Sequence, residues 1–124
     1  FGLVACEMCH WQRWTHYAAL LPAMVGIFAR HATVKRSMIV LAALLVATSG
    51  AIGVFHAGVE YGFWPGLTAC TAAPGGTLAD IMNAPITRCD TPAWTMFGIS
   101  MAGYNALISL GGALLLLGLV SRSR

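Results

Sequence analysis

The chain has 124 residues, of which 58% are hydrophobic and only 9% are charged. A soluble globular domain usually contains about 25% charged residues, so this chain cannot surround a core with a charged shell. Disordered chains are poor in hydrophobic residues, which excludes that class as well. The net charge of +3 is too small and too dispersed for nucleic-acid binding. The composition therefore predicts a small, all-α integral membrane protein with a single domain over residues 1–124.

Three apolar segments are predicted to cross the membrane as helices of one bundle. Residues 11–29 are the weakest candidate, because Arg13 and other polar side chains crowd the first turns. Residues 38–59 and 93–120 contain no charged side chain. Each exceeds or matches the roughly 20 apolar residues that a transmembrane helix needs. A short loop at about 30–37 and a long loop at about 60–92 would join the three spans.

The charged residues divide unevenly between the two ends of these spans. One end carries five positive charges, on Arg30, Lys35, Arg36, Arg122 and Arg124. The other end carries two positive and four negative charges, on Arg13, Arg88, Glu7, Glu60, Asp80 and Asp90. The first end is predicted to be cytoplasmic, since Lys and Arg mark that face. The four cysteines then lie on the exported side, where disulfides persist: Cys6, Cys9, Cys70 and Cys89.

This topology also places residue 1 outside the cytoplasm. An odd number of spans with an exported start favours a further span upstream, of which the apolar stretch FGLVA would be the end. The long exported loop is rich in Pro and Gly, which is typical of turns. Within it, Thr77-Leu-Ala-Asp80 has the pattern of a helix N-cap with an acid three residues later. This pattern predicts either a short amphipathic helix on the membrane surface or an ordinary loop turn.

Cys6 and Cys9 form a C-x-x-C motif at the start of the first span. The helix dipole favours a thiolate at a helix N-terminus, which favours a redox role for this pair. Arg13 follows Cys9 by one turn and shares its helix face. Its charge can reach the lipid headgroups along an extended side chain. Alternatively, it can face the bundle interior and stabilise an anion there.

Cys70 and Cys89 are separated by 18 residues within the exported loop. A structural disulfide between them would stabilise the loop by about 3 kcal/mol, whereas two cysteine pairs on one side also permit exchange between pairs. Cys6-x-x-Cys9-His10 matches the haem-attachment pattern C-x-x-C-H, but haem leaves the other two cysteines unexplained. A zinc site is disfavoured because Cys70 and Cys89 form no second short knuckle.

A membrane dithiol needs an electron acceptor, and the chain has no flavin or nicotinamide motif. A quinone dissolved in the bilayer is the economical acceptor. Arg13 beside the Cys9 thiolate would stabilise that thiolate and then the developing quinol anion. His56 lies near the exported end of the second span, at about the depth of Arg13, and can bind a polar ring substituent or serve as a hydrogen-bonded structural histidine. His16 is expected at the membrane interface.

Three stretches carry a resemblance to a known family: CEMCHWQRW, FHAGVEYGFW followed by Cys70, and RCD…W…FGISMAGYNALIS. In their joint order they resemble the bacterial DsbB family of membrane thiol oxidases, over essentially the whole chain. The resemblance implies a bundle of four transmembrane helices, three of them present here, in the bacterial inner membrane. It also implies re-oxidation of DsbA, a periplasmic thioredoxin-fold oxidase, with electrons passing to ubiquinone or menaquinone.

The resemblance further implies a role for each cysteine. The Cys70–Cys89 disulfide would be reduced by the partner, with Cys70 forming the mixed disulfide. Cys6 would then attack Cys89, leaving Cys9 as the thiolate that faces the quinone. The segment between Cys70 and Cys89 is shorter than in the family and contains Gly and Pro.

The resemblance also matches Arg13 to a quinone-proximal arginine and His56 to a quinone-site histidine. Two other readings of the sequence stay open. One is an enzyme similar to vitamin K epoxide reductase, which is also helical with paired cysteines and a quinone. The other is a non-enzyme, either a membrane anchor carrying c-type haem at CEMCH or a structural subunit stapled by disulfides.

Overall fold

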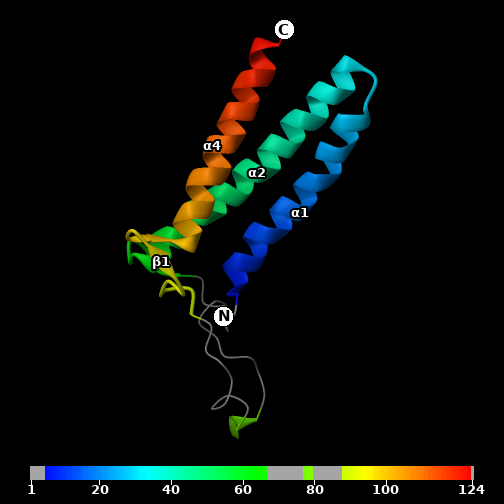
Figure 1. Ribbon diagram of the computed structural model, residues 1–124. Coiled ribbons are helices and arrows are strands. Elements are labelled where there is room, and N and C mark those ends of the chain that lie inside the picture. The colour runs from blue at the N-terminus through cyan, green and yellow to red at the C-terminus, as the bar shows by residue number, and fades with distance from the viewer. Residues whose placement is uncertain (1–4, 67–76, 80–87, 124) are drawn as a thin grey trace.

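The computed structural model describes residues 5–66, 77–79 and 88–123. Three long helices lie side by side in an elongated bundle (Figure 1): α1 (Glu7–Phe28), α2 (Ala32–Glu60) and α4 (Met101–Arg122). Helix α2 occupies the middle and packs against both of the others. Helices α2 and α4 are long and apolar enough to cross a membrane. The prediction of an all-α membrane bundle is confirmed.

The first two helices are longer than the spans predicted from hydropathy. Helix α1 begins at Glu7 rather than at residue 11, because Cys6 caps it by accepting a hydrogen bond from the backbone N–H of Cys9. Helix α2 begins at Ala32, so only residues 29–31 connect it to α1. Polar residues at helix ends extend these helices beyond their apolar segments, which a hydropathy pattern does not register.

The predicted start of the third span at residue 93 is wrong for the helix, which begins at Met101. Residues before it form a short antiparallel hairpin of β1 (Thr95–Met96) and β2 (Ile99–Ser100). Its turn contains Phe97 and Gly98 with φ of 52° and 78°. A right-handed helix cannot include such positive φ angles. Ser100 then caps α4 by accepting a hydrogen bond from the backbone N–H of Gly103 at 3.2 Å.

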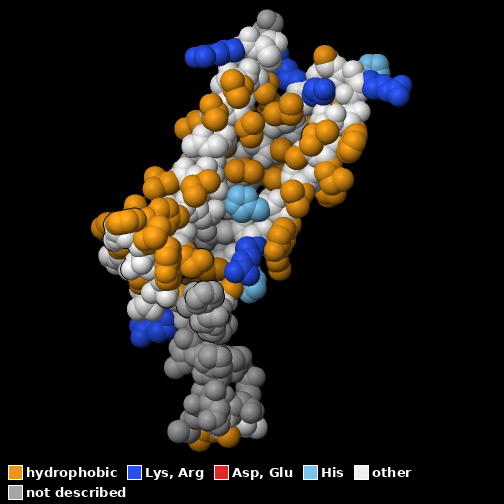
Figure 2. All heavy atoms as spheres, in the orientation of Figure 1, with side chains coloured by type: hydrophobic (Ala, Val, Ile, Leu, Met, Phe, Trp, Pro, Cys, Tyr) orange, Lys and Arg blue, Asp and Glu red, His pale blue; other side chains and the backbone are white. Residues whose placement is uncertain are grey.

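Small residues form the interior of the bundle and large hydrophobic side chains cover its outside. A Cβ atom on Gly53 of α2 would lie 3.0 Å from Ala102 O and 3.1 Å from Ala106 N of α4, so glycine permits this close approach. Figure 2 shows hydrophobic side chains over the outer surfaces of the helices. Membrane helices pack through small residues in the same way, because lipid rather than water covers their outer faces.

The described charges separate along the bundle as the sequence predicts. Arg30, Lys35 and Arg36 lie where α1 connects to α2, at the end of the bundle where α4 also terminates. Figure 2 shows basic side chains gathered at that end. The start of α1, with its two cysteines, lies at the opposite end. Of the predicted amphipathic helix at 77–82, Leu78 and Ala79 are helical and residues 80–82 lie outside the described residues.

Candidate active site

Cys6 and Cys9 are held together by the geometry of the first helical turn. Cys6 has an extended backbone as the N-cap of α1, so its side chain folds back over that turn. Its Sγ lies 3.4 Å from the backbone nitrogen of Cys9 and 3.0 Å from the Cys9 Sγ. A disulfide needs about 2.05 Å between sulfurs, so a small movement closes the bond. The geometry of the C-x-x-C motif therefore permits a disulfide between Cys6 and Cys9.

The environment of Cys6, which precedes the helix, favours its thiolate. The hydrogen bond with the Cys9 thiol lowers the pKa of Cys6 below its ordinary value. Burial opposes this shift, the Cys9 backbone N–H adds to it, and the neighbouring Cys89 thiol opposes it, but the net direction stays downward. The Cys6 thiol is therefore more acidic than an ordinary cysteine thiol. It also lies at a helix N-terminus, where the helix dipole favours negative charge.

Cys89 reaches this pair from the segment that joins α2 to α4. Its side chain is 1% exposed and belongs to the same buried cluster as Cys6, Met8 and Val59. It also hydrogen-bonds with the Cys6 side chain. The structure therefore brings together three of the four predicted redox cysteines, while Cys70 lies outside the described residues.

The residues on either side of Cys89 point to the surface. Arg88 and Asp90 form a two-pronged ion pair, with Nε–Oδ1 and Nη2–Oδ2 distances of 2.9 and 2.6 Å. The Arg88 guanidinium lowers the pKa of Asp90, so this carboxylate stays ionised. The pair leaves the intervening cysteine directed inward, where it meets Cys6.

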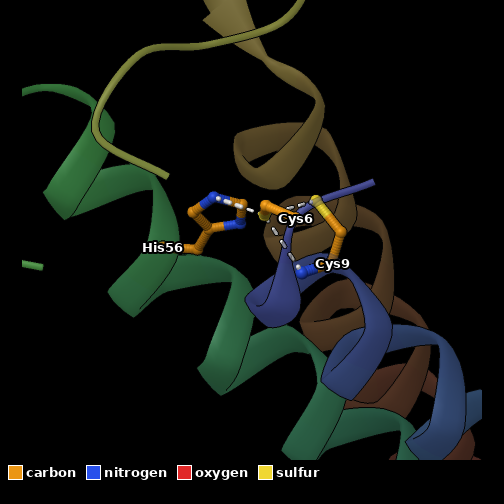
Figure 3. A group of neighbouring side chains, drawn as sticks. All are labelled: Cys6, Cys9 and His56. Carbon is orange, nitrogen blue, oxygen red and sulfur yellow. Dashed lines mark hydrogen bonds between the residues drawn. The ribbon is translucent and has the colours of Figure 1, made fainter. Parts of the chain in front are cut away.

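His56 joins the cysteines from helix α2. Its Nε2 lies 3.5 Å from Cys6 Sγ, and the ring is 2% exposed. Figure 3 shows the three side chains of Cys6, Cys9 and His56 pointing toward one another between the two helices. Glu60, one turn beyond His56, places Oε1 3.7 Å from Nε2. Its other oxygen, Oε2, is buried and has no hydrogen-bond partner among the described residues.

These donors also resemble part of a metal site. One ligand atom from each of Cys6, Cys9 and His56 falls within 4.8 Å of the others, and zinc takes thiolate and imidazole ligands. The spacing of Cys70 and Cys89 disfavours zinc, but this spacing takes no account of His56, which the fold places beside Cys6 and Cys9. Whether His56 can act as a ligand depends on which of its ring nitrogens carries the hydrogen.

A chain of amide side chains continues from His56 into the bundle. Gln12 Nε2 lies 3.0 Å from His56 Nδ1 and 3.2 Å from Met8 O. Asn105 of α4 donates from Nδ2 to Gln12 Oε1 at 2.7 Å. Asn105 Nδ2 also donates to the carbonyl and hydroxyl oxygens of Ser49, each at 3.2 Å. One polar network thus links all three helices within an otherwise apolar bundle.

Sequence reasoning missed this network. Gln12 is buried at 7% exposure, whereas Arg13, the residue singled out beside it, is exposed and makes no ion pair among the described residues. His16, expected at the interface, instead lies 3.1 Å from Asn105 Oδ1. One feature of the sequence could have indicated the network: Asn105 is a polar residue within a span that has no charged side chain. Such polar side chains in membrane helices usually hydrogen-bond to other helices.

Comparison with known proteins agrees with the chemistry of this site. The sequence model described as disulfide bond formation protein DsbB matches residues 1–119. The chain belongs to the DsbB family. Membership makes it a membrane oxidoreductase of disulfide bond formation, and it confirms the resemblance seen in the sequence motifs.

One relative with a similar sequence is the uncharacterized protein RP370 of Rickettsia prowazekii (strain Madrid E). It is 24% identical over 128 residues, which cover 97% of this chain and 73% of that protein. No solved structure matches this DsbB-family chain.

Proposed function

We propose that this chain re-oxidises a DsbA-like thioredoxin-fold protein in the periplasm and passes the electrons to a membrane quinone, either ubiquinone or menaquinone. The observation that carries the proposal is the contact of Cys6 with both Cys9 and Cys89 in one buried cluster. Thiol–disulfide exchange requires the attacking sulfur to reach the disulfide that it breaks. Cys6 is the sulfur that can exchange with either neighbour.

The first half of the cycle transfers the partner's electrons to the C-x-x-C pair. A partner thiolate attacks Cys70 of the Cys70–Cys89 disulfide and releases the Cys89 thiolate. This thiolate attacks Cys6, forming Cys6–Cys89 and releasing Cys9 as a thiolate. Cys89 is the attacking group in this step, the reverse of the expected attack of Cys6 on Cys89, because Cys89 is then a free thiolate whereas Cys6 is part of a disulfide.

The second half releases the partner and reduces the quinone. The partner's other thiol displaces Cys70, which attacks Cys89 and releases Cys6 as a thiolate. The lowered pKa of Cys6 suits this step, since a more acidic thiol leaves faster. Cys6 and Cys9 then give two electrons and two protons to the quinone and form their disulfide again. The net result is one disulfide in the partner and one quinol.

The quinone is proposed to approach the outer face of α1. Cys9 is half-buried, and Arg13 follows it by one turn with an exposed side chain. Tyr17, one turn beyond Arg13 and also exposed, continues this face with aromatic surface, and the exposed Trp14 flanks Tyr17 one turn earlier. A cation there would stabilise the anion that develops on the quinone, while His56 lies behind the cysteines on α2.

The orientation and the number of spans belong to the same proposal. The basic end of the bundle, with Arg30, Lys35, Arg36 and Arg122, would face the cytoplasm of a bacterial cell. The cysteines would then face the periplasm across the inner membrane. Helix α1 would be the third span of this chain, beside α2 and α4.

Quinone turnover by the purified protein tests the proposal. A reduced DsbA-like protein and a short-chain ubiquinone are mixed with the protein in detergent, and quinone absorbance is followed without oxygen. We expect quinone loss equal to the partner disulfide formed, and none when either component is omitted. A disulfide-stapled subunit or a haem anchor would leave both unchanged, which would contradict the proposal.

A further inference from the structure

The hydrogen-bond chain behind the cysteines fixes the protonation of His56. It runs from Ser49 through Asn105 and Gln12 to the imidazole ring, across all three long helices. Each amide in it can be oriented without assuming where any hydrogen lies. This holds because the chain begins and continues on backbone carbonyls, which only accept hydrogen bonds.

The orientation of Asn105 follows from the Ser49 carbonyl. The Asn105 side-chain atom 3.2 Å from Ser49 O must be the NH2 group, since two carbonyl oxygens would repel. The same NH2 group lies 2.7 Å from a Gln12 side-chain atom, which must therefore be the oxygen Oε1. The Asn105 oxygen is turned the other way, where it accepts from the Ser109 hydroxyl at 2.9 Å.

The orientation of Gln12 then decides the state of the ring. With Oε1 facing Asn105, the NH2 group of Gln12 faces Met8 O at 3.2 Å and His56 Nδ1 at 3.0 Å. Nδ1 must accept this hydrogen bond, so it carries no hydrogen itself. A neutral imidazole carries one hydrogen, which is then on Nε2, 3.5 Å from Cys6 Sγ.

We infer that Asn105 acts through Gln12 as a positioning residue, holding His56 in the tautomer whose Nε2–H points at the Cys6 sulfur. Gln12 is 7% and His56 2% exposed, so water does not compete for these bonds. The ring therefore donates to a Cys6 thiolate without itself becoming charged. In this tautomer Nε2 cannot bind a zinc ion, because it carries a hydrogen in place of the lone pair that the metal would need.

Among the described residues, the titratable groups nearest the ring lie on α1 and α2, and Cys89 adjoins Cys6 in the same buried cluster. Cys6 and Cys9 lie at the start of α1, and Glu60 follows on α2 with Oε1 3.7 Å from Nε2. The contribution of α4 is the neutral Asn105, which touches Gln12 but not the ring. The importance of this tautomer for turnover rests on the proposed function, whereas the tautomer itself does not.

The test measures the ring nitrogens of His56 directly. The reduced protein is labelled with ¹⁵N-histidine, and the His56 signals are assigned by their loss in His56→Ala. Nitrogen chemical shifts distinguish a protonated from an unprotonated ring nitrogen. We expect hydrogen on Nε2 and none on Nδ1 in the unaltered protein, and the opposite tautomer would overturn the inference.

Two isosteric variants test whether Asn105 and Gln12 determine the tautomer of His56. Gln12→Glu places a carboxylate, which only accepts, against Nδ1 and should draw the hydrogen onto that nitrogen. Asn105→Asp should do the same from one residue further away, because the new carboxylate turns the Gln12 amide over. Ser109→Ala is the matched control, since it removes hydroxyl contacts to Asn105 Oδ1 and His16 Nε2 but none to the Asn105 NH2 group or to Gln12, and it should leave the tautomer unchanged.

A second readout follows the reactivity of Cys6. Loss of a hydrogen bond to a charged group should raise the apparent pKa for Cys6 alkylation by about one unit, and so slow alkylation below that pKa about tenfold. The alkylated sulfur is assigned by tandem mass spectrometry in Gln12→Glu, Asn105→Asp and Ser109→Ala.

An unchanged tautomer in either carboxylate variant would overturn the inference, as would equal slowing in all three variants. Neither readout uses quinone or partner. A failure of the proposed function therefore appears as lost turnover with the tautomer results intact.

Discussion

Cys6 Sγ and His56 Nε2 lie 3.5 Å apart although 50 positions separate the two residues in the chain. The contact joins the N-cap of α1 to the C-terminal end of α2, and both side chains are buried. It gives the Cys6 thiolate a neutral hydrogen-bond donor in a place that water does not reach. The reactive end of the C-x-x-C pair is therefore built from two helices rather than from the motif alone.

The lowered pKa of Cys6 predicts the pH dependence of its alkylation. The Cys9 thiol is the main cause, so the Cys6 thiolate is present at lower pH than in an exposed thiol, whose pKa is about 8.5. Cys9→Ala removes this donor and should shift the alkylation midpoint upward by about one unit. Cys9→Ser keeps a hydroxyl donor and should shift it less. Equal shifts in the two variants would contradict this cause.

Cys9→Ser should abolish quinone reduction by a reduced partner. Serine cannot form the Cys6–Cys9 disulfide, so the two electrons have no route to the quinone. The rate of quinone loss under anaerobic conditions measures this, and it should fall to the rate without protein. Ser121→Ala, which removes only a hydroxyl bonded to Gly118 O at the far end of α4, is the control and should keep full activity.

Cys70→Ser should uncouple the protein from its partner while leaving the C-x-x-C pair able to react. Reduced partner should no longer drive quinone reduction, because no mixed disulfide forms. A small dithiol such as dithiothreitol reduces the Cys6–Cys9 disulfide directly and should still drive it. Full quinone reduction by the reduced partner in this variant would show that Cys70 is not the entry point.

Arg13→His should weaken quinone binding more than it slows the chemistry of bound quinone. A shorter side chain, neutral at pH 8, no longer stabilises the developing anion, and an exposed charge pair contributes about 1 kcal/mol. The Michaelis constant for quinone should therefore rise about fivefold at that pH. Arg36→His, at the opposite end of the bundle, should leave it unchanged. An unchanged constant in Arg13→His would remove Arg13 from the quinone site.

Gly53→Ala should destabilise the contact between α2 and α4. The new Cβ would lie 3.0 Å from Ala102 O and 3.1 Å from Ala106 N, and these backbone atoms cannot move aside independently of the helix. Overpacking of this kind costs about 1–3 kcal/mol. Gly111→Ala is the matched control, because nothing lies within 4 Å of its Cβ. Equal unfolding free energies in detergent for both variants would contradict the packing described here.

Hydropathy and charge were sufficient to predict the helical bundle and the separation of its charges. They did not predict that α4 starts at Met101, because the hairpin before it depends on the positive φ angles of Phe97 and Gly98 rather than on polarity. The residues around that turn are mostly apolar, so hydropathy assigns them to the membrane span. Local backbone conformation decided the boundary.

Only those site residues that belong to a recognisable sequence motif could be predicted. Cys6, Cys9 and His56 were identified, and the structure brings them together. Gln12 and Asn105 were not, since their role exists only when three helices place their amides within 2.7 Å of each other. Arg13 has a recognisable charge, yet its buried neighbour Gln12 is the residue that contacts His56.

The most direct test counts thiols in the fully reduced Cys70→Ser, Cys89→Ser double variant, before and after anaerobic addition of a short-chain ubiquinone. Maleimide labelling and mass spectrometry report how many cysteines remain reduced. The account predicts that both thiols, Cys6 and Cys9, disappear together and that one quinol forms for each pair. Two thiols that persist in the presence of excess quinone would contradict it.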